Sequence, residues 1–259
     1  EIQFGDWSSD VCSSDLADYQ SRDKLQDLLL FPSSHAPDKL TTLDEYTQRM
    51  PEKQKVIYYA TGKDYASVER LPQMELLKEK GIEVLYFFDA VDEFAIDALR
   101  EYKNKKFQSV SRGDLNLDGI DSPESKKNTE EIYKDNESLI KAVKEQLTGK
   151  IKEVKISNRL KSSPVCLVSG DTGISLSMEQ ILAEMDKTMF KATRILELNP
   201  NHEVFAVLKN LYETVPASEA FNDYCDLLDN QALLIECLPP EDPICFANKI
   251  AKLMARSEK

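Results

Sequence analysis

The sequence predicts an α/β fold followed by a second, α+β domain that ends in a helical hairpin. Three observations support this: strand-like and helical stretches alternate up to residue 110, a polar linker follows, and two apolar helical patterns end the chain. Because alternating strands and helices build covered sheets, we expect a small αβα unit with a mostly parallel sheet. The second domain should hold a short sheet and the hairpin.

Composition limits the class of protein. The 259 residues are 41% apolar, which suffices for two ordinary domains. No apolar run approaches the roughly 18 residues of a transmembrane helix, and no signal peptide is evident. The net charge of −13 argues against nucleic acid and anionic membrane as main partners. We therefore expect a cytoplasmic protein without a nucleic-acid or membrane partner.

The cysteines and histidines predict no metal site. There are two histidines in loop-like stretches and an odd number of cysteines, none with C-x-x-C spacing. We expect reduced, buried thiols. The cysteines are Cys12, Cys166, Cys225, Cys237 and Cys245.

The first domain begins after a segment that we set aside. Residues 1–16 are rich in Ser and Asp without a regular period, so we interpret them as non-native. A helical pattern follows at 25–29 and ends at Pro32. Thr42 and Glu45 form a capping box, which begins a helix that runs to Met50.

Strands and helices then alternate. β-branched and aromatic runs at 56–60, 82–88 and 107–110 predict three strands. A helix broken by Pro72 lies between the first two, and Gly81 ends it as a C-cap. The helix after the second strand should carry Phe94, Ile96, Leu99 and Tyr102.

A polar stretch at 111–128 marks the domain boundary. We assign 17–117 to the first domain, 118–128 to a linker and 129–259 to the second domain, whose first helix Asn128 would cap. Asp114-x-Asn116-x-Asp118-Gly119 matches half a calcium loop, but Ser125 stands where a Glu is needed. We favour a polar turn there.

The second domain contains three strand-like runs, at 151–156, 164–168 and 195–198. Asn199 and Pro200 should begin a helix as N-cap and first residue. The helix at 175–189 places Met178, Ile181, Leu182, Met185 and Met189 on one face. A core face is one interpretation; since Met suits adaptable surfaces, a binding face is the other.

The terminal hairpin combines helical patterns at about 220–238 and 243–255 around a Pro-rich break. The first helix is apolar over more than half its circumference, so it needs cover on two sides. A second copy of the chain is one cover, and a buried core position is the alternative. The predicted dimer interface comprises Leu227, Leu228, Leu234, Ile235, Leu238, Ile244, Ala247, Ile250 and Leu253.

Asp89, Asp92 and Glu93 follow a buried strand and are the candidates for chemistry. Carboxylates there can hold Mg²⁺ for a hydrolase or phosphotransferase. They are also ordinary helix caps and first-turn charges. With no phosphate loop or nucleophile motif in the sequence, no catalytic, cofactor or metal residue is predicted.

Six segments stand out when the chain is taken as a whole. They are residues 25–34, 42–46 with 54–62, 83–85 with 92–94, 159–169 (RLKSSPVCLVS), 195–202 and 227–234. Together they resemble the heat-shock protein 90 chaperone family in its bacterial HtpG-like form, in order and with family-like spacing over residues 17–255.

The resemblance implies a chaperone of protein folding and the stress response, here represented by the end of the middle domain and the C-terminal dimerisation domain. The ATP-binding domain would be absent. This chain should then need no cofactor and hydrolyse no ATP, whereas the full-length parent would use ATP and Mg²⁺. The resemblance also favours the homodimer over the buried helix.

The resemblance further implies a surface for partly unfolded client proteins. It places Phe94 and Asp97 on the middle-domain side, and a second set on the C-terminal domain: Ile174, Met178, Ile181, Leu182 and Met185. Tail-binding cochaperones are not expected, since the chain ends without the Met-Glu-Glu-Val-Asp tail. The alternatives are the Asp89/Asp92 enzyme and a purely structural dimerisation module.

Overall fold

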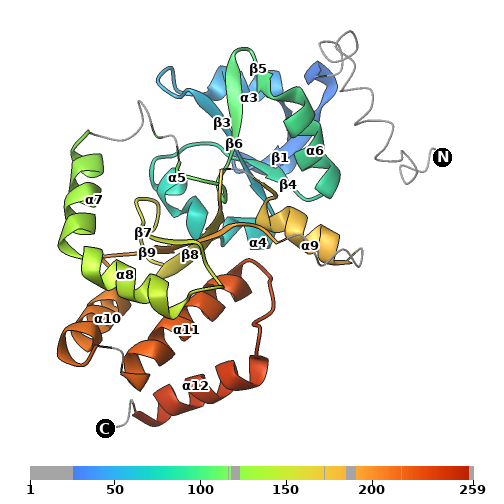
Figure 1. The fold of residues 1–259 in the computed structure, drawn as a ribbon. Helices are drawn as coiled ribbons and strands as arrows, with labels where there is room; N and C mark the ends of the chain where they lie inside the picture. Colours follow the sequence, from blue (N-terminus) through green and yellow to red (C-terminus); the bar gives the residue numbers. More distant parts are fainter. Residues whose placement is uncertain are drawn as a thin grey trace. The chain divides into compact units, whose positions relative to one another are not determined.

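The computed structural model of the chain describes residues 26–115, 117, 123–171, 173–184, 191–216 and 218–256. These residues form helices and two sheets, which confirms the mixed α/β class (Figure 1). The chain divides into two compact units, unit 1 (1–110 with 114–121) and unit 2 (111–113 with 122–259). None of the helices in the described ranges is long and apolar enough to span a membrane. Residues 1–16, Met185 and Met189 lie outside those ranges.

Unit 1 is built on a six-stranded sheet with the order β2-β1-β4-β3-β6-β5. Its central strand β3 runs parallel to β4 and β6, whereas the other three pairings are antiparallel. The prediction of a mostly parallel sheet is therefore wrong. The strands are β1 (Leu30–Ser33), β2 (Ala36–Thr42), β3 (Val56–Thr61), β4 (Leu85–Phe87), β5 (Glu101–Tyr102) and β6 (Lys105–Ser109).

Of the added antiparallel strands, β1 and β5 fall at the ends of stretches that were predicted to be helical, and β2 falls in a predicted loop. In β1, Phe31 and Ser33 are buried while Leu30 is exposed, the alternation of a strand. Pro32, which has no N–H to donate, lies where the register with β2 shifts. The helix α6 (Ala90–Leu99) ends before Arg100, which has a left-handed φ of 65°. Tyr102 therefore lies in β5 instead of on that helix.

Helices cover both faces of this sheet. Phe87 stacks on Tyr59 with ring centroids 4.6 Å apart, in the core that also contains residues of α3 and α6. Its neighbour Tyr86 points the other way and meets Tyr65 of α4 at 5.2 Å. The predicted capping box at Thr42 is confirmed. The helices are α3 (Leu43–Arg49), α4 (Tyr65–Glu69), α5 (Glu75–Glu79) and α6 (Ala90–Leu99), with short 3₁₀ turns at Gln26–Leu28 and Pro72–Met74.

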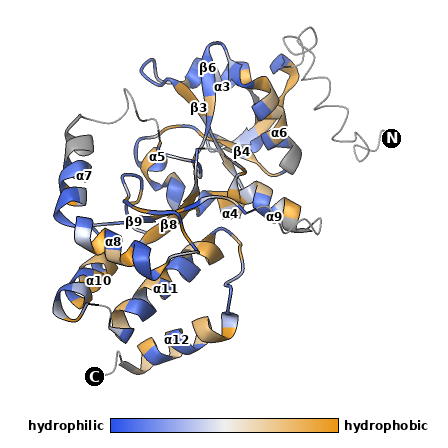
Figure 2. Cartoon of the chain, viewed as in Figure 1, coloured by the Kyte–Doolittle hydropathy of each residue, from blue (hydrophilic) through white to orange (hydrophobic). Residues whose placement is uncertain are grey.

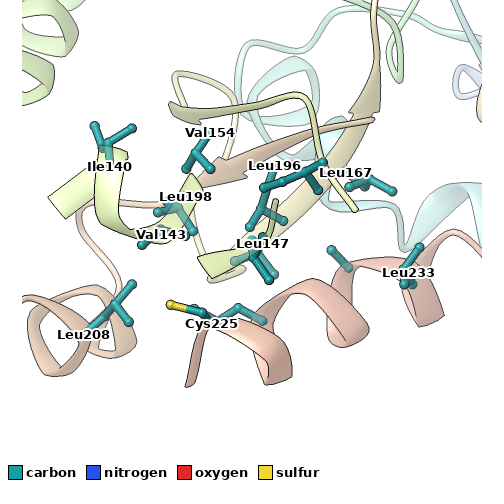
Figure 3. Close-up of a cluster of buried hydrophobic side chains, with 14 of the residues drawn as sticks. Ile140, Val143, Leu147, Val154, Leu167, Leu196, Leu198, Leu208, Cys225 and Leu233 are labelled. Atoms are coloured by element: carbon teal, nitrogen blue, oxygen red, sulfur yellow. The ribbon is translucent and has the colours of Figure 1, made fainter. Parts of the chain in front are cut away.

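Unit 2 packs its helices against a three-stranded sheet with the order β7-β9-β8. The central strand β9 is parallel to β7 and antiparallel to β8. Figure 3 shows the core, in which side chains from α8, α10 and α11 meet the sheet. Its elements are α7 (Pro123–Asp135), α8 (Glu137–Gln146), β7 (Glu153–Ile156), β8 (Val165–Ser169), α9 (Leu176–Glu184), β9 (Arg194–Leu198), α10 (Glu203–Thr214), α11 (Glu219–Ile235) and α12 (Pro243–Arg256).

Two predicted helix starts in unit 2 are wrong. Asn128 lies inside α7, which begins at Pro123 within the predicted linker. Asn199 does not cap α10; His202 does, with Nδ1 accepting from the Val204 amide. Asn199 is buried, and its side-chain amide nitrogen, Nδ2, instead donates to the carbonyl of Ser163 in a loop at 2.9 Å. The domain limits 17–117, 118–128 and 129–259 stay a prediction.

Candidate functional site: the C-terminal hairpin and the α9 surface

The first hairpin helix, α11, is part of the core of unit 2. Ser218 caps it by accepting a hydrogen bond from the Phe221 amide at 3.2 Å. Its buried apolar residues recur at the spacing of one helix face, so α11 has one face against this chain's own core. They are Phe221, Cys225, Leu228, Ala232 and Leu233.

The chain reverses after α11 through a left-handed residue. Cys237 has φ 55°, and the next amide, of Leu238, donates to the Leu233 carbonyl at 2.9 Å. This is the hydrogen-bond pattern of a Schellman C-cap, in which glycine is the usual left-handed residue. Leu238 returns to the core and is 7% exposed. The turn therefore fixes the direction in which the chain leaves toward α12.

Lysines attach α12 to α11. Lys252 Nζ lies 2.8 Å from Asp223 Oδ2, and Lys249 pairs with both Asp223 and Asp226 of α11. Lys150, which follows α8, contacts Asp226 Oδ1 at 3.0 Å. Two lysines of α12 are thus paired with carboxylates of α11.

These contacts set the charge states of α11. Burial works against the charge of Asp226, yet the hydrogen bonds from Lys249 and Lys150 lower its pKa overall. Three residues on, burial raises the pKa of Asp229 to about 6, although Lys150 and Arg194 lie near enough to oppose the shift. The pKa values of the two carboxyls are therefore shifted in opposite directions.

The opposite side of α12 leaves apolar side chains in solvent. Ile244 is 76% exposed, Met254 67% and Ile250 38%, and Ala247 is also exposed. Leu234 of α11 is 47% exposed. We call these five residues the hairpin stripe. Figure 2 shows hydrophobic residues interspersed with hydrophilic ones along α12.

The predicted interface residues fall into three classes. Leu234, Ile244, Ala247 and Ile250 belong to the hairpin stripe. Leu227, Ile235 and Leu253 are half-buried, while Leu228 and Leu238 are buried in the chain's own core. Sequence reasoning missed Met254, although its ten-residue spacing from Ile244 fits the same helical seam. The assignment of these residues to a dimer stays a prediction.

The α9 helix presents a second partly exposed surface. Ser175 caps it, accepting from the Met178 amide at 3.1 Å. The buried Glu179 anchors the inner side by accepting from Arg194 Nη2 at 2.6 Å. Met178 and Leu182, four residues apart, are half-buried. This places two of the predicted client-binding residues at the edge of the core, within reach of solvent.

The other predicted client residues are placed less completely. Ile174 is half-buried and packs against the core of unit 2. The side chain of Ile181 and the whole of Met185 lie outside the described residues. In unit 1, Phe94 is 48% exposed and Asp97 is exposed, three residues apart on α6. The assignment of these residues to clients also stays a prediction.

The acidic residues after β4 form a helix cap. Asp92 Oδ2 accepts from the amide of Asp89 at 3.3 Å, which is the contact between the third helical residue and the N-cap. Burial raises the pKa of Asp92 to about 6. Among the described residues no group of three or more His, Cys, Asp or Glu side chains could hold a metal ion. Nothing here supports the hydrolase or phosphotransferase alternative.

The chain is similar to known chaperones along almost its whole length. The family model described as Hsp90 protein matches residues 4–258. Chaperone protein HtpG of Bacillus subtilis is 50% identical over 235 residues, which are 90% of this chain and 36% of that protein. The HtpG of Alkaliphilus oremlandii is 51% identical with the same coverage, and that of Oceanobacillus iheyensis is 48% identical over 98% of this chain.

These matches confirm the resemblance found in the sequence. The chain spans a little over a third of the length of the curated relatives it matches, 36% to 38%. The family match begins at residue 4, inside the segment interpreted as non-native, and the origin of that segment stays a prediction. Since the family model covers nearly every residue, the chain belongs to the Hsp90 protein family.

Proposed function

We propose that this chain is the dimerising and client-binding part of an ATP-dependent folding chaperone. The curated relatives that it matches are named chaperone protein HtpG. We assign ATP and Mg²⁺ to the part of those relatives that this chain does not span, and we expect no ATP turnover from the chain itself. We expect a cytoplasmic location.

The hairpin stripe is the observation that supports dimerisation most. In α12, Lys249 and Lys252 pair with carboxylates of α11, while Ile244, Ile250 and Met254 are exposed to solvent. An exposed apolar stripe of this kind is left without cover by its own chain. Fully burying a side chain of the size of Ile244 or Met254 contributes about 1.5–3 kcal/mol. A second copy, related by two-fold symmetry, would cover the stripe with its own and form a four-helix bundle.

The α9 surface supports client binding by its chemistry. Met178 is flexible and polarizable, so it adapts to apolar segments of different shape, and Leu182 adds apolar area beside it. Ile174, Ile181 and Met185 would extend the same surface, with Phe94 and Asp97 of α6 as a further contact.

The mass in solution tests the dimer. We expect light scattering to give about 59 kDa at micromolar concentration, twice the 29.5 kDa of one chain. Replacing Ile244 and Met254 with Ser should raise the dimer dissociation constant at least about a hundredfold. Replacing Val207 and Val215, two other exposed apolar residues of unit 2, with Ser is the matched control. The assignment would be refuted if the parent chain were monomeric. It would also be refuted if the Ile244/Met254 and Val207/Val215 substitutions weakened the dimer equally.

Suppression of client aggregation tests the α9 surface. The Met178→Ser/Leu182→Ser variant should remain a dimer and lose most of its ability to keep a denatured model protein soluble. The Val207→Ser/Val215→Ser variant should retain that ability. Undiminished suppression in the α9 variant would show that clients bind elsewhere. A chain that dimerises and never suppresses aggregation would be a purely structural module.

A further inference from the structure

We propose that Ser111–Gly113 is a latch strand that buried Arg159 locks onto the edge of the unit 2 sheet. The Gly113 amide donates to the Ser169 carbonyl at 2.9 Å, and the Ser169 amide donates to the Ser111 carbonyl at 2.9 Å. Arg112 pairs with Ser169 as a parallel bridge. The three residues thus pair with the outer edge of β8 through a single β-bridge.

Arg159 supplies the lock. Its side chain is fully buried, and Nη2 donates to the Gly113 carbonyl at 2.5 Å. The same nitrogen lies 2.9 Å from Glu197 Oε1 of β9, a carboxylate whose other oxygen accepts from Ser157 at 2.6 Å. Because a buried charge is stable only with its partners in place, this ion pair holds the guanidinium where it binds the latch.

The latch also fits closely against the residues that follow β8. Gly113 has φ 56°, and a Cβ added there would lie 1.7 Å from Asp171 Oδ1. Arg112 Nη2 donates to the Gly173 carbonyl at 2.6 Å. The site therefore requires glycine at 113, both for the backbone angle and for the space.

The position of the latch in the chain gives it a conformational role. Residues 111–113 belong to unit 2, whereas the chain on either side, up to 110 and over 114–121, belongs to unit 1. The chain therefore enters the unit 2 sheet at the latch and leaves it again before α7. In this proposal Arg159, held by Glu197, keeps the short segment docked on the sheet.

Amide exchange of the full chain, followed by NMR, tests the latch. In Arg159→Met the amides of Gly113 and Ser169 should exchange about tenfold to a hundredfold faster, since a buried hydrogen bond to a charged group is lost. Amides within the β7–β9 pairing should change by no more than about twofold. Arg194→Met is the matched control: Arg194 lies opposite Ser169 on β9, and the substitution removes its ion pair with Glu179 of α9 while it leaves Arg159 and Gly113 in place.

A second variant keeps the proposal testable if Arg159→Met does not fold. Gly113→Ala should release the latch from the other side and speed exchange at Ser169, while Arg159 keeps its partner Glu197. The proposal is overturned if Ser169 stays protected in Gly113→Ala. It is equally overturned if the whole sheet exchanges faster together, or if Arg194→Met exposes Gly113 as much as Arg159→Met does.

Discussion

The two helices of the terminal hairpin are neighbours in the chain and in space, yet they are held in opposite ways (Figure 1). α11 buries Phe221, Leu228 and Leu233 in its own unit, whereas α12 faces α11 with lysines and leaves Ile244 and Met254 in solvent. Apolar content alone would not separate them. The placement of charge around each helix does, and it marks α12 as the helix with an uncovered apolar face.

The largest expected effect is on the free energy of unfolding, and it should distinguish the buried apolar residues of α11 from the exposed ones of α12. Leu233→Ala should lower the free energy of unfolding by about 2–4 kcal/mol, because it opens a cavity beside a fully packed core. Ile244→Ala should change that of the monomer by less than about 0.5 kcal/mol and weaken only the dimer. Urea unfolding at several protein concentrations measures both. Similar losses in the two variants, independent of concentration, would show that α12 is a core helix too.

The next effect concerns two carboxyls of α11. The folded pKa of Asp229, about 6, lies above its ordinary value of 3.8, so this group costs stability as pH rises from about 4 to 6. Asp229→Asn should therefore raise the free energy of unfolding at pH 7 by roughly 1–2 kcal/mol and flatten its pH dependence in that window.

Asp226 is the matched control for this pH response. Its folded pKa is lowered, so it contributes stability above about pH 4 that is lost as the pH falls further. Asp226→Asn should lower the free energy of unfolding at pH 7 by about 1 kcal/mol, after allowance for solvent screening. Urea unfolding between pH 4 and 8 measures the two variants, and effects of the same sign at pH 7 would contradict the contrast.

A smaller effect should detach α12 without unfolding the core. Lys249→Met removes the cation between Asp223 and Asp226, a partly exposed contact that is worth about 1 kcal/mol. Amides of α12 should then exchange about fivefold faster, while those of β8 and β9 keep their rates. The effect should shrink in 1 M salt, as expected of screened charges. Equal acceleration in helix and sheet would mean that the hairpin does not open separately.

Local sequence signals predicted the elements that depend on neighbouring residues. The Thr42 capping box and the turn at Gly81 need only contacts within a few residues, and both are present. Leu30–Ser33 has the apolar content of a helix but pairs with β2 and β4, strands that come later in the chain. No local pattern could reveal that pairing.

In the candidate site, too, the local helical patterns were predictable from the sequence, but the contacts between distant segments were not. The sequence predicted Ile244 and Ile250 as interface residues, but which apolar residues of α11 face the core depends on the sheet and on α10. Leu228 and Leu234 look alike in sequence, and only the first is buried. Arg159 was noted only as part of a family-like segment. Its buried contacts could not be predicted, since a single arginine in a loop has no period and its partners lie at positions 113 and 197.

The smallest effect tests the turn that joins the two helices. The sequence suggested buried thiols, and Cys166 and Cys225 are buried, but Cys237 and Cys245 are exposed. Cys237 holds a left-handed φ of 55°, which disfavours any side chain with a Cβ. Cys237→Gly should raise the free energy of unfolding by about 0.5–1 kcal/mol.

Cys245→Gly is the matched control, because the same substitution in the first turn of α12 should lower stability by up to about 1 kcal/mol. The stability of each variant is compared with that of the parent chain by the midpoint of urea unfolding. A gain at 237 with a loss at 245 means that the left-handed turn, and not the removal of a thiol, limits the stability of the hairpin. Changes of one sign at both positions would assign the effect to the thiols.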